Sequence, residues 1–275
     1  MSYQGRIGFL VVLSLVAAVI TPAAPAPYSP DANTVYLFHL DEPGGTSVAT
    51  NSATATVGTN AIAFDGNNFA GDGINQPTVT TILGATGYAG FGNCADLSAA
   101  NDLGFGLDVN ANGAFMLDDG APLSNDRLAT HSFFGVGNVF TLEALINVPS
   151  ITSGNRQIIA TDNGSANTDR GFQFRINATG QLEFNFVGVN TSSITTPIPT
   201  TGDHAFVANE WFHVALVYDG ANALFYWTRL SAIATNANLI GGPSAEGVDI
   251  NDDALLVIGN EARAVGVTGA TEGLL

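Results

Sequence analysis

The sequence predicts an all-β protein, an antiparallel β-sandwich or jelly roll made of many short strands. Hydrophobic residues make up 46% of the 275 residues and charged ones only 11%, which allows a buried core and excludes a disordered polyanion. The 32 glycines, with many Asn, Thr and Ser residues, indicate frequent tight turns. Short β-rich runs recur with almost no helical period, as is typical of sandwiches and jelly rolls.

The chain is acidic and contains no lysine. Its 24 acidic residues oppose seven basic ones, all of them arginine, and the net charge is −17. Nucleic acid requires a basic stripe and anionic lipid attracts basic segments, so this charge excludes the first partner and disfavours the second. The single Cys94 cannot form an intrachain disulfide; we expect a small buried residue, with a reactive thiol as the alternative.

The first 26 residues have the pattern of a signal peptide. Met1–Arg6 carries one positive charge, and the predominantly apolar Ile7–Ile20 is too short to cross a bilayer comfortably. Ala24–Ala26 supplies small residues for cleavage. We therefore expect export, with the mature protein secreted, periplasmic or at the cell surface; a retained anchor is the alternative.

Two parts follow the signal peptide of residues 1–26. Residues 27–32 form a short Ala/Pro-rich linker, and residues 33–275 are expected to form a single domain. The domain opens with a β-rich run, Thr34–Leu40, which the turn residues of Asp41–Gly45 close.

Later strands are expected at four places. Residues 46–135 are less regular, but Phe140–Asn147 alternates between apolar and polar residues, which predicts a strand with one buried face. Asn209–Gly220 is largely apolar on both faces, so we expect an interior strand there. Ala223–Trp227 is expected to pair back onto it, and Leu255–Ile258 is a last short strand.

The clearest hairpin is Gly171–Val187, in which both arms alternate. With a three-residue loop, Phe174 lies opposite Phe184 and Arg175 lies opposite Glu183. One register therefore satisfies an aromatic pair and a charge pair at once.

The segment Glu210–Gly220, with the order Trp-x-His-Val-Ala-x-Val-Tyr-Asp-Gly, resembles the signature strand of laminin-G-like jelly-roll domains. These domains belong to the concanavalin A-like lectin/glucanase superfamily. Val35–Gly45, Phe140–Val148 and Leu256–Asn260 are similar to other strands of that family and occur in family order. The resemblance implies a concanavalin A-like jelly roll over residues 33–275.

Two departures from the family pattern are visible. Thr228 and Arg229 stand where family members commonly carry an Asp-Gly hairpin, and the chain stops at Glu272–Leu275, about where a closing strand is expected. A missing strand leaves an open sheet edge through which the protein can self-associate. The alternatives are a chain cut short and a strand donated by another chain.

No catalytic pattern is present. Glucanases of this fold place carboxylates two residues apart on one strand face, whereas Glu143 and Glu183 each stand alone on their strands. We therefore expect a protein that is not an enzyme. A divergent polysaccharide hydrolase or lyase and a structural surface protein are the alternatives.

One string has the spacing of a calcium loop, with Gly113 at its sixth position. Its candidate oxygen ligands are Asp108, Asn110, Asn112 and Asp119. The flanks read as strand rather than helix, and Asn-Gly also makes a plain hairpin, which is the alternative.

A second oxygen-rich loop runs from Asp162 to Asp169, and these two carboxylates are further calcium candidates. The resemblance places such loops on the rim of the sandwich, where calcium sits in laminin-G-like domains; a solvated turn is the alternative. If calcium binds, millimolar calcium raises the stability of the fold.

Sugar binding requires an exposed aromatic ring with polar partners. Tyr226 and Trp227 are the candidates, because adjacent strand positions turn one of them outward, and packing is the alternative. The resemblance places Trp211 in the core. We therefore expect an exported, non-catalytic recognition or adhesion module that binds glycans or cell-surface material, with calcium as a candidate cofactor.

Overall fold

The computed structural model describes residues 26–34, 37–44, 48–50, 52–53, 61–63, 83–97, 105–107, 139–162, 170–186, 193–231, 236–245 and 257–259. Within these residues every regular element is a strand and all strand pairs are antiparallel, which confirms the all-β prediction. In the same residues no helix has the length and apolar character needed to cross a membrane.

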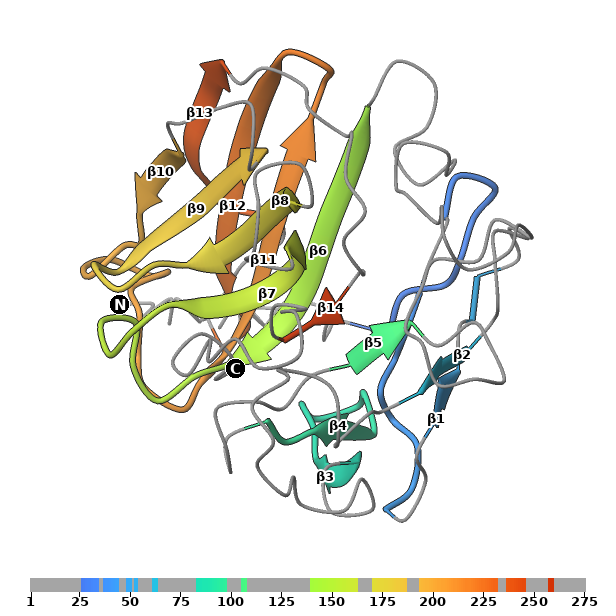
Figure 1. Ribbon diagram of the computed structural model, residues 1–275. Helices are drawn as coiled ribbons and strands as arrows, with labels where there is room; N and C mark the ends of the chain where they lie inside the picture. The colour runs from blue at the N-terminus through green and yellow to red at the C-terminus, as the bar shows by residue number, and fades with distance from the viewer. Residues whose placement is uncertain are drawn as a thin grey trace, which may run out of the picture.

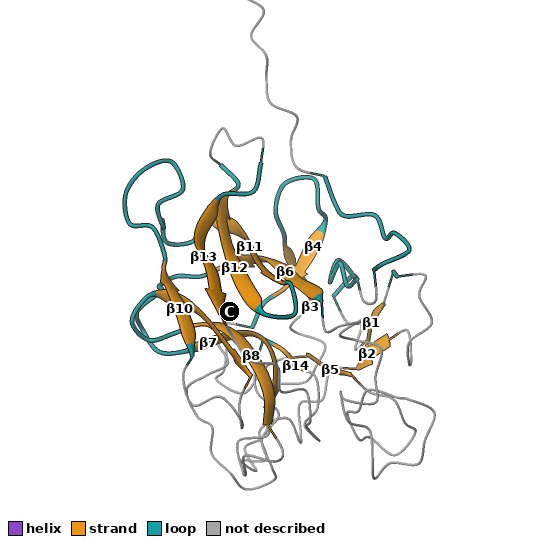
Figure 2. Ribbon diagram, turned by 90° about the horizontal axis from the view of Figure 1, so that it is seen from above, coloured by secondary structure: helices purple, strands orange, loops and turns teal. Residues whose placement is uncertain are grey.

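Two sheets form the layers of the molecule, and Figure 2 shows them one above the other. The four-stranded sheet has the order β13-β12-β11-β6. Its strands are β6 (Phe140–Asn147), β11 (Trp211–Tyr218), β12 (Asn222–Arg229) and β13 (Leu239–Ala245).

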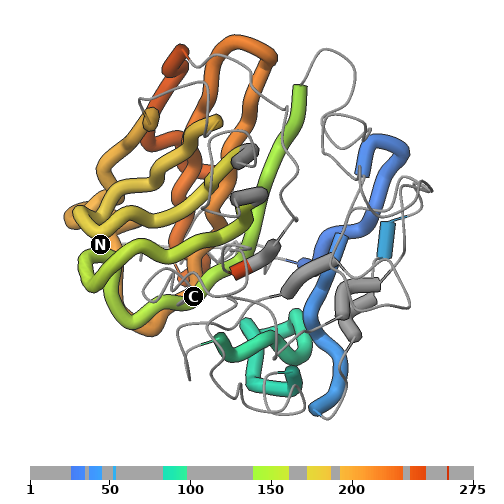
Figure 3. Tube along the Cα trace, viewed as in Figure 1, coloured from blue at the N-terminus to red at the C-terminus, as the bar shows by residue number. Residues whose placement is uncertain are grey.

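The larger sheet has the order β1-β2-β5-β14-β7-β8-β9-β10 (Figure 1). Its strands are β1 (Val48–Thr50), β2 (Ala61–Ala63), β5 (Phe105–Leu107), β7 (Arg156–Asp162), β8 (Arg170–Ile176), β9 (Gln181–Phe186), β10 (Ile194–Pro197) and β14 (Val257–Ile258). The late β14 lies beside β7, so distant parts of the chain meet within one sheet (Figure 3). A separate hairpin consists of β3 (Leu83–Thr86) and β4 (Asn93–Ala95).

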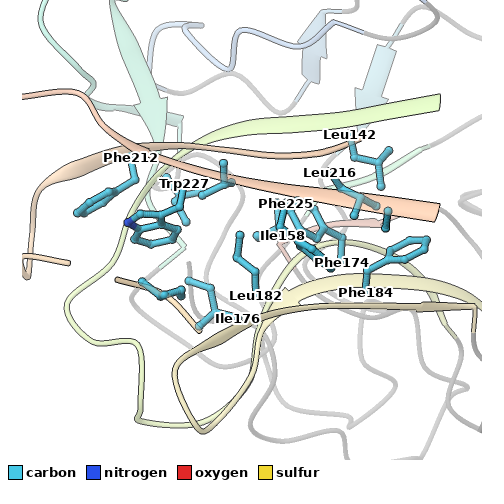
Figure 4. Close-up of a cluster of buried hydrophobic side chains, with 14 of the residues drawn as sticks. Leu142, Ile158, Phe174, Ile176, Leu182, Phe184, Phe212, Leu216, Phe225 and Trp227 are labelled. Carbon is cyan, nitrogen blue, oxygen red and sulfur yellow. The ribbon is translucent and has the colours of Figure 1, made fainter. Parts of the chain in front are cut away.

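The core lies between the two layers and is rich in aromatic side chains. Phe172, Phe174, Phe184 and Phe186 of β8 and β9 are fully buried, and Phe212, Phe225 and Trp227 of the opposite sheet are buried as completely. Figure 4 shows how side chains from the two sheets point toward one another. Tight packing of such large rings is the main stabilising contribution available to a two-layer fold.

The register of the β8–β9 hairpin is the predicted one. Phe174 pairs with Phe184 and Arg175 with Glu183, and the loop turns at Gly180, which has a φ of 79°. That left-handed conformation is accessible to glycine at little cost, and it allows the three-residue connection.

The interior position predicted for Asn209–Gly220 is also found, because β11 lies between β6 and β12. The opening strand predicted at Thr34–Leu40 is described only in part, because residues 35 and 36 lie outside the described residues. The described residues there contribute an isolated bridge at Phe38, and Leu40 turns to a φ of 57°, which ends the extended backbone.

Candidate functional site

The alternation of β11 creates two distinct faces of the four-stranded sheet. Phe212, Val214, Leu216 and Tyr218 are fully buried between the layers. The intervening residues point the other way, onto what we call the outer face of the four-stranded sheet. His213 and Ala215 therefore lie on the opposite side of the sheet from the aromatic core, where His213 is partly buried and Ala215 is 4% exposed.

One row across this outer face combines an aromatic ring with a carboxylate. Ala215 pairs with Glu143 on one side and with Tyr226 on the other. Two strand spacings separate Glu143 from Tyr226, about 9–10 Å between Cα atoms, with only a methyl side chain between them. The Glu143 side chain is 40% exposed and Tyr226 is partly exposed. Leu239, opposite Tyr226 on β13, extends the row with a half-exposed apolar side chain.

Three polar side chains meet at the Glu143 end of the row. The Tyr28 hydroxyl donates to Glu143 Oε2 at 3.1 Å and lies 3.0 Å from His213 Nε2, which is itself 3.1 Å from the same Oε2. The single proton of the Tyr28 hydroxyl points to Glu143, and the Glu143 carboxylate can only accept hydrogen bonds. We therefore assign a hydrogen to His213 Nε2, which also points to Glu143. Tyr28 thus reaches the sheet from residues 26–34, far from β6 and β11 in the sequence.

These contacts shift the pKa of the Glu143 carboxyl group and the pKa of the Tyr28 hydroxyl. The hydrogen bond from His213 lowers the pKa of Glu143 against the opposing effect of burial, and the charge of His213 and the Tyr28 hydroxyl lower it further. Burial first, and then the charge and hydrogen bond of Glu143, raise the pKa of Tyr28. Tyr28 therefore remains a proton donor and Glu143 an ionised acceptor at neutral pH.

Of the two tryptophans, Trp227 lies in the core, while Trp211 points outward and not into the core as the resemblance implied. Trp227 is fully buried and stacks on Phe212 with ring centroids 4.4 Å apart, so of the predicted pair only Tyr226 lies on the outer face. Trp211 was expected in the core but is only partly buried, because its position on β11 points it outward. There it meets Tyr88 of the β3–β4 hairpin edge-on, with centroids 6.5 Å apart.

The predicted calcium ligands fall almost entirely beyond the described residues. Asp108, Asn110, Asn112, Asp119 and Asp169 lie outside them. Asp162 ends β7, where its backbone pairs with Arg170, but its carboxylate is not among the described side chains. Within the ranges that the structure describes, no three His, Cys, Asp or Glu side chains gather to hold a metal ion. Calcium binding stays a prediction.

The larger sheet carries a different polar row on the face turned away from the core. Arg175 donates to Glu183 Oε1 from Nη2 at 2.7 Å and from Nε at 3.0 Å, while Asn177 donates to the other oxygen at 3.0 Å. Gln157 lies opposite Arg175 and is fully buried. Because this carboxylate is buried and already accepts three hydrogen bonds, Glu143 is the better candidate for contact with a ligand.

Sequence reasoning noted Glu143 but did not find its partners. The alternation of β6 and β11 places Glu143 and His213 on one face of each strand, yet only the sheet order brings those strands together. Tyr28 lies in an irregular segment and carried no sequence signal.

The chain belongs to a known family. The family described as the concanavalin A-like lectin/glucanases superfamily matches residues 118–274, which is more than half of the chain. The resemblance to laminin-G-like domains is therefore confirmed, and with it the concanavalin A-like fold class.

Several solved structures are similar over part of the fold. The carbohydrate-binding module CBM40 of the Ruminococcus gnavus IT-sialidase, bound to α2,3-sialyllactose, is 18% identical, with 49% of this chain and 70% of that one covered and a TM-score of 0.36. A Trypanosoma rangeli sialidase in complex with 2,3-difluorosialic acid is 12% identical, with coverages of 87% and 28% and a TM-score of 0.45. The binding domain of botulinum neurotoxin serotype G is 16% identical, with coverages of 43% and 31% and a TM-score of 0.26. No curated protein matches the chain.

Proposed function

We propose that this protein is an exported, non-catalytic module that recognises glycans or other hydroxyl-rich cell-surface material through the outer face of the four-stranded sheet. The observation that carries the proposal is the row in which Glu143 and Tyr226 flank Ala215. An aromatic ring offers an apolar platform for one face of a sugar, and an ionised carboxylate accepts strong hydrogen bonds from its hydroxyls.

The charges on this face favour binding over hydrolysis. A glycosidase of the usual kind requires two carboxyl groups about 5–9.5 Å apart on either side of the scissile bond. Among the described strand residues of the outer face, Glu143 is the single carboxylate. It is held ionised by His213, whereas a general acid needs a raised pKa.

The same proposal includes calcium as a bound ion that stabilises the fold. The oxygen-rich loops Asp108–Asp119 and Asp162–Asp169 have the composition to bind it, and an acidic chain gains stability when a divalent cation reduces its self-repulsion.

A glycan array tests the function. We expect the wild-type protein to bind one class of glycan without releasing reducing sugar, and Tyr226→Ala to weaken that binding by about tenfold, equivalent to about 1.4 kcal/mol. Thr195→Ala, an exposed change on β10 in the other sheet, is the matched control and keeps wild-type affinity. Hydrolysis of the bound glycan would support the alternative, a polysaccharide hydrolase of this fold. Equal glycan binding by Tyr226→Ala and the wild type would show that the binding site lies elsewhere.

A further inference from the structure

Among the described residues, the hydrogen bonds that join the segment of residues 26–34 to the outer face come from one side chain, that of Tyr28. Nearly all of its residues are exposed, and Tyr28 itself is 43% exposed. The Tyr28 hydroxyl makes these hydrogen bonds to Glu143 and His213. A segment joined to the sheet by so few hydrogen bonds opens at low free-energy cost.

The remainder of the segment is ordered by itself. Asp31 Oδ1 accepts hydrogen bonds from the Asn33 amide and the Thr34 hydroxyl, both at 2.9 Å, and the Thr34 amide donates to the Asp31 carbonyl at 3.2 Å. This turn requires nothing from the sheet, so it persists when Tyr28 leaves. Release of Tyr28 therefore leaves the turn of residues 31–34 intact.

Tyr28 supplies a hydroxyl donor, the same hydrogen-bonding group that a sugar would present. Its ring presents an apolar face, lying 6.2 Å from the His213 ring between centroids, and its hydroxyl donates to Glu143 Oε2. A sugar hydroxyl that binds Glu143 would donate to the same carboxylate. Tyr28 and a glycan hydroxyl at the same position therefore compete for one acceptor atom, Glu143 Oε2.

We propose that Tyr28 is an internal ligand of the Glu143–His213 site, so that residues 26–34 act as an autoinhibitory strap which a glycan must displace. This inference rests on the glycan-binding function proposed above. It also defines the ligand more closely, because a glycan that displaces the phenol must itself present a hydroxyl donor to Glu143.

The expected cost to affinity follows from the population of the open strap. A ligand that binds only the open form has its affinity reduced by the fraction of open molecules. Two hydrogen bonds at a half-exposed position, one of them to a carboxylate, correspond to an open fraction of about one in ten. Tyr28→Phe, which keeps the ring and removes the hydroxyl, is thus expected to bind glycans up to about tenfold more tightly, and Tyr28→Ala at least as tightly.

The test combines a glycan array with NMR of protein labelled at its tyrosine rings. The Tyr28 signal is assigned by its loss in Tyr28→Phe. In Glu143→Ala without any glycan, we expect the Tyr28 signal to change from that of a docked ring to that of a mobile ring. In the wild type we expect the same change when the best glycan of the array is added. Asn33→Ala, in the same segment but with an exposed side chain, is the control and leaves the Tyr28 signal and the glycan affinity unchanged.

The outcomes of this test distinguish a failure of the strap from a failure of the proposed glycan-binding function. A Tyr28 signal that is insensitive to Glu143→Ala, or equal glycan affinity in the wild type, Tyr28→Phe and Tyr28→Ala, overturns the strap and leaves the recognition function intact. If the NMR signal shows release but no variant binds any glycan on the array, the proposed function fails and the competition fails with it.

Discussion

Glu143 and His213 form a diagonal contact across β6 and β11, with Oε2 and Nε2 3.1 Å apart. Neither residue lies directly opposite the other: Glu143 pairs with Ala215, and His213 pairs with Leu145. Diagonal side chains on neighbouring strands lie within reach of each other when at least one is long. The contact places an ionised acceptor beside the small side chain of Ala215, which is 4% exposed, and the proposed site depends on it.

The first prediction concerns the acidity of Glu143. Its pKa is lowered chiefly by the His213 hydrogen bond, so this contact stabilises the fold at pH values above the usual glutamate range, and the stabilisation is lost as the pH falls through the lowered pKa. A carboxyl-carbon NMR titration measures it directly. His213→Ala is expected to bring the pKa of Glu143 back toward or above its ordinary value. An unchanged pKa of Glu143 in this variant would contradict the assigned contact.

The two tryptophans are expected to differ in fluorescence. Trp211→Phe leaves the fully buried Trp227, whose emission is expected to be blue-shifted and resistant to acrylamide. Trp227→Phe leaves the partly exposed Trp211, which is expected to be quenched several-fold more efficiently. Similar quenching of both variants would place Trp227 at the surface and restore it as a ligand-binding candidate.

The Arg175–Glu183 pair is expected to stabilise β8 and β9. Its two side chains are only 16% and 8% exposed, so Glu183→Gln removes a negative charge that faces a largely buried guanidinium, at a cost of about 3 kcal/mol in the free energy of unfolding. Urea unfolding measures the loss. Thr195→Val, opposite Glu183 on β10 and exposed, is the control and is expected to stay within about 0.5 kcal/mol of the wild type. A loss below that level for Glu183→Gln would show the pair to be energetically neutral.

Calcium is expected to raise the melting temperature. A site with calcium at about a hundred times its Kd adds about 2.7 kcal/mol, equivalent to roughly 5–10 °C for a domain of this size. The double variant Asp108→Asn, Asp119→Asn is expected to remove this increase, and magnesium is the control ion. A melting temperature that is indifferent to calcium and to a chelator would leave the acidity of the chain as a matter of solubility alone.

Local patterns predicted the parts of the fold that depend on nearby residues. The register of Arg175 against Glu183 follows from alternation over a short hairpin, and the interior position of β11 follows from its two apolar faces. Alternation also required that Tyr226 and Trp227 point to opposite faces, but which one faces the core depends on the packing of the second sheet. For this reason the sequence could not choose between them.

Contacts between distant segments could not be predicted in the same way. Which strand lies beside β6 is a property of the sheet order, and that order brings His213 to Glu143. Tyr28 comes from a segment without periodicity, so no pattern placed it on the sheet. Trp211 was assigned to the core from the family resemblance, although its own position in the alternation of β11 points it outward.

The central claim is that a glycan binds over Ala215, between Glu143 and Tyr226. Alanine-methyl NMR during titration with the best glycan of the array tests it most directly. Ala215 is expected to show a large, saturable shift, while Ala223 of β12, fully buried on the core side of the same sheet, is expected to remain unchanged. Saturable shifts that spare Ala215 and fall on alanines elsewhere in the protein would contradict the assignment of this face as the binding site.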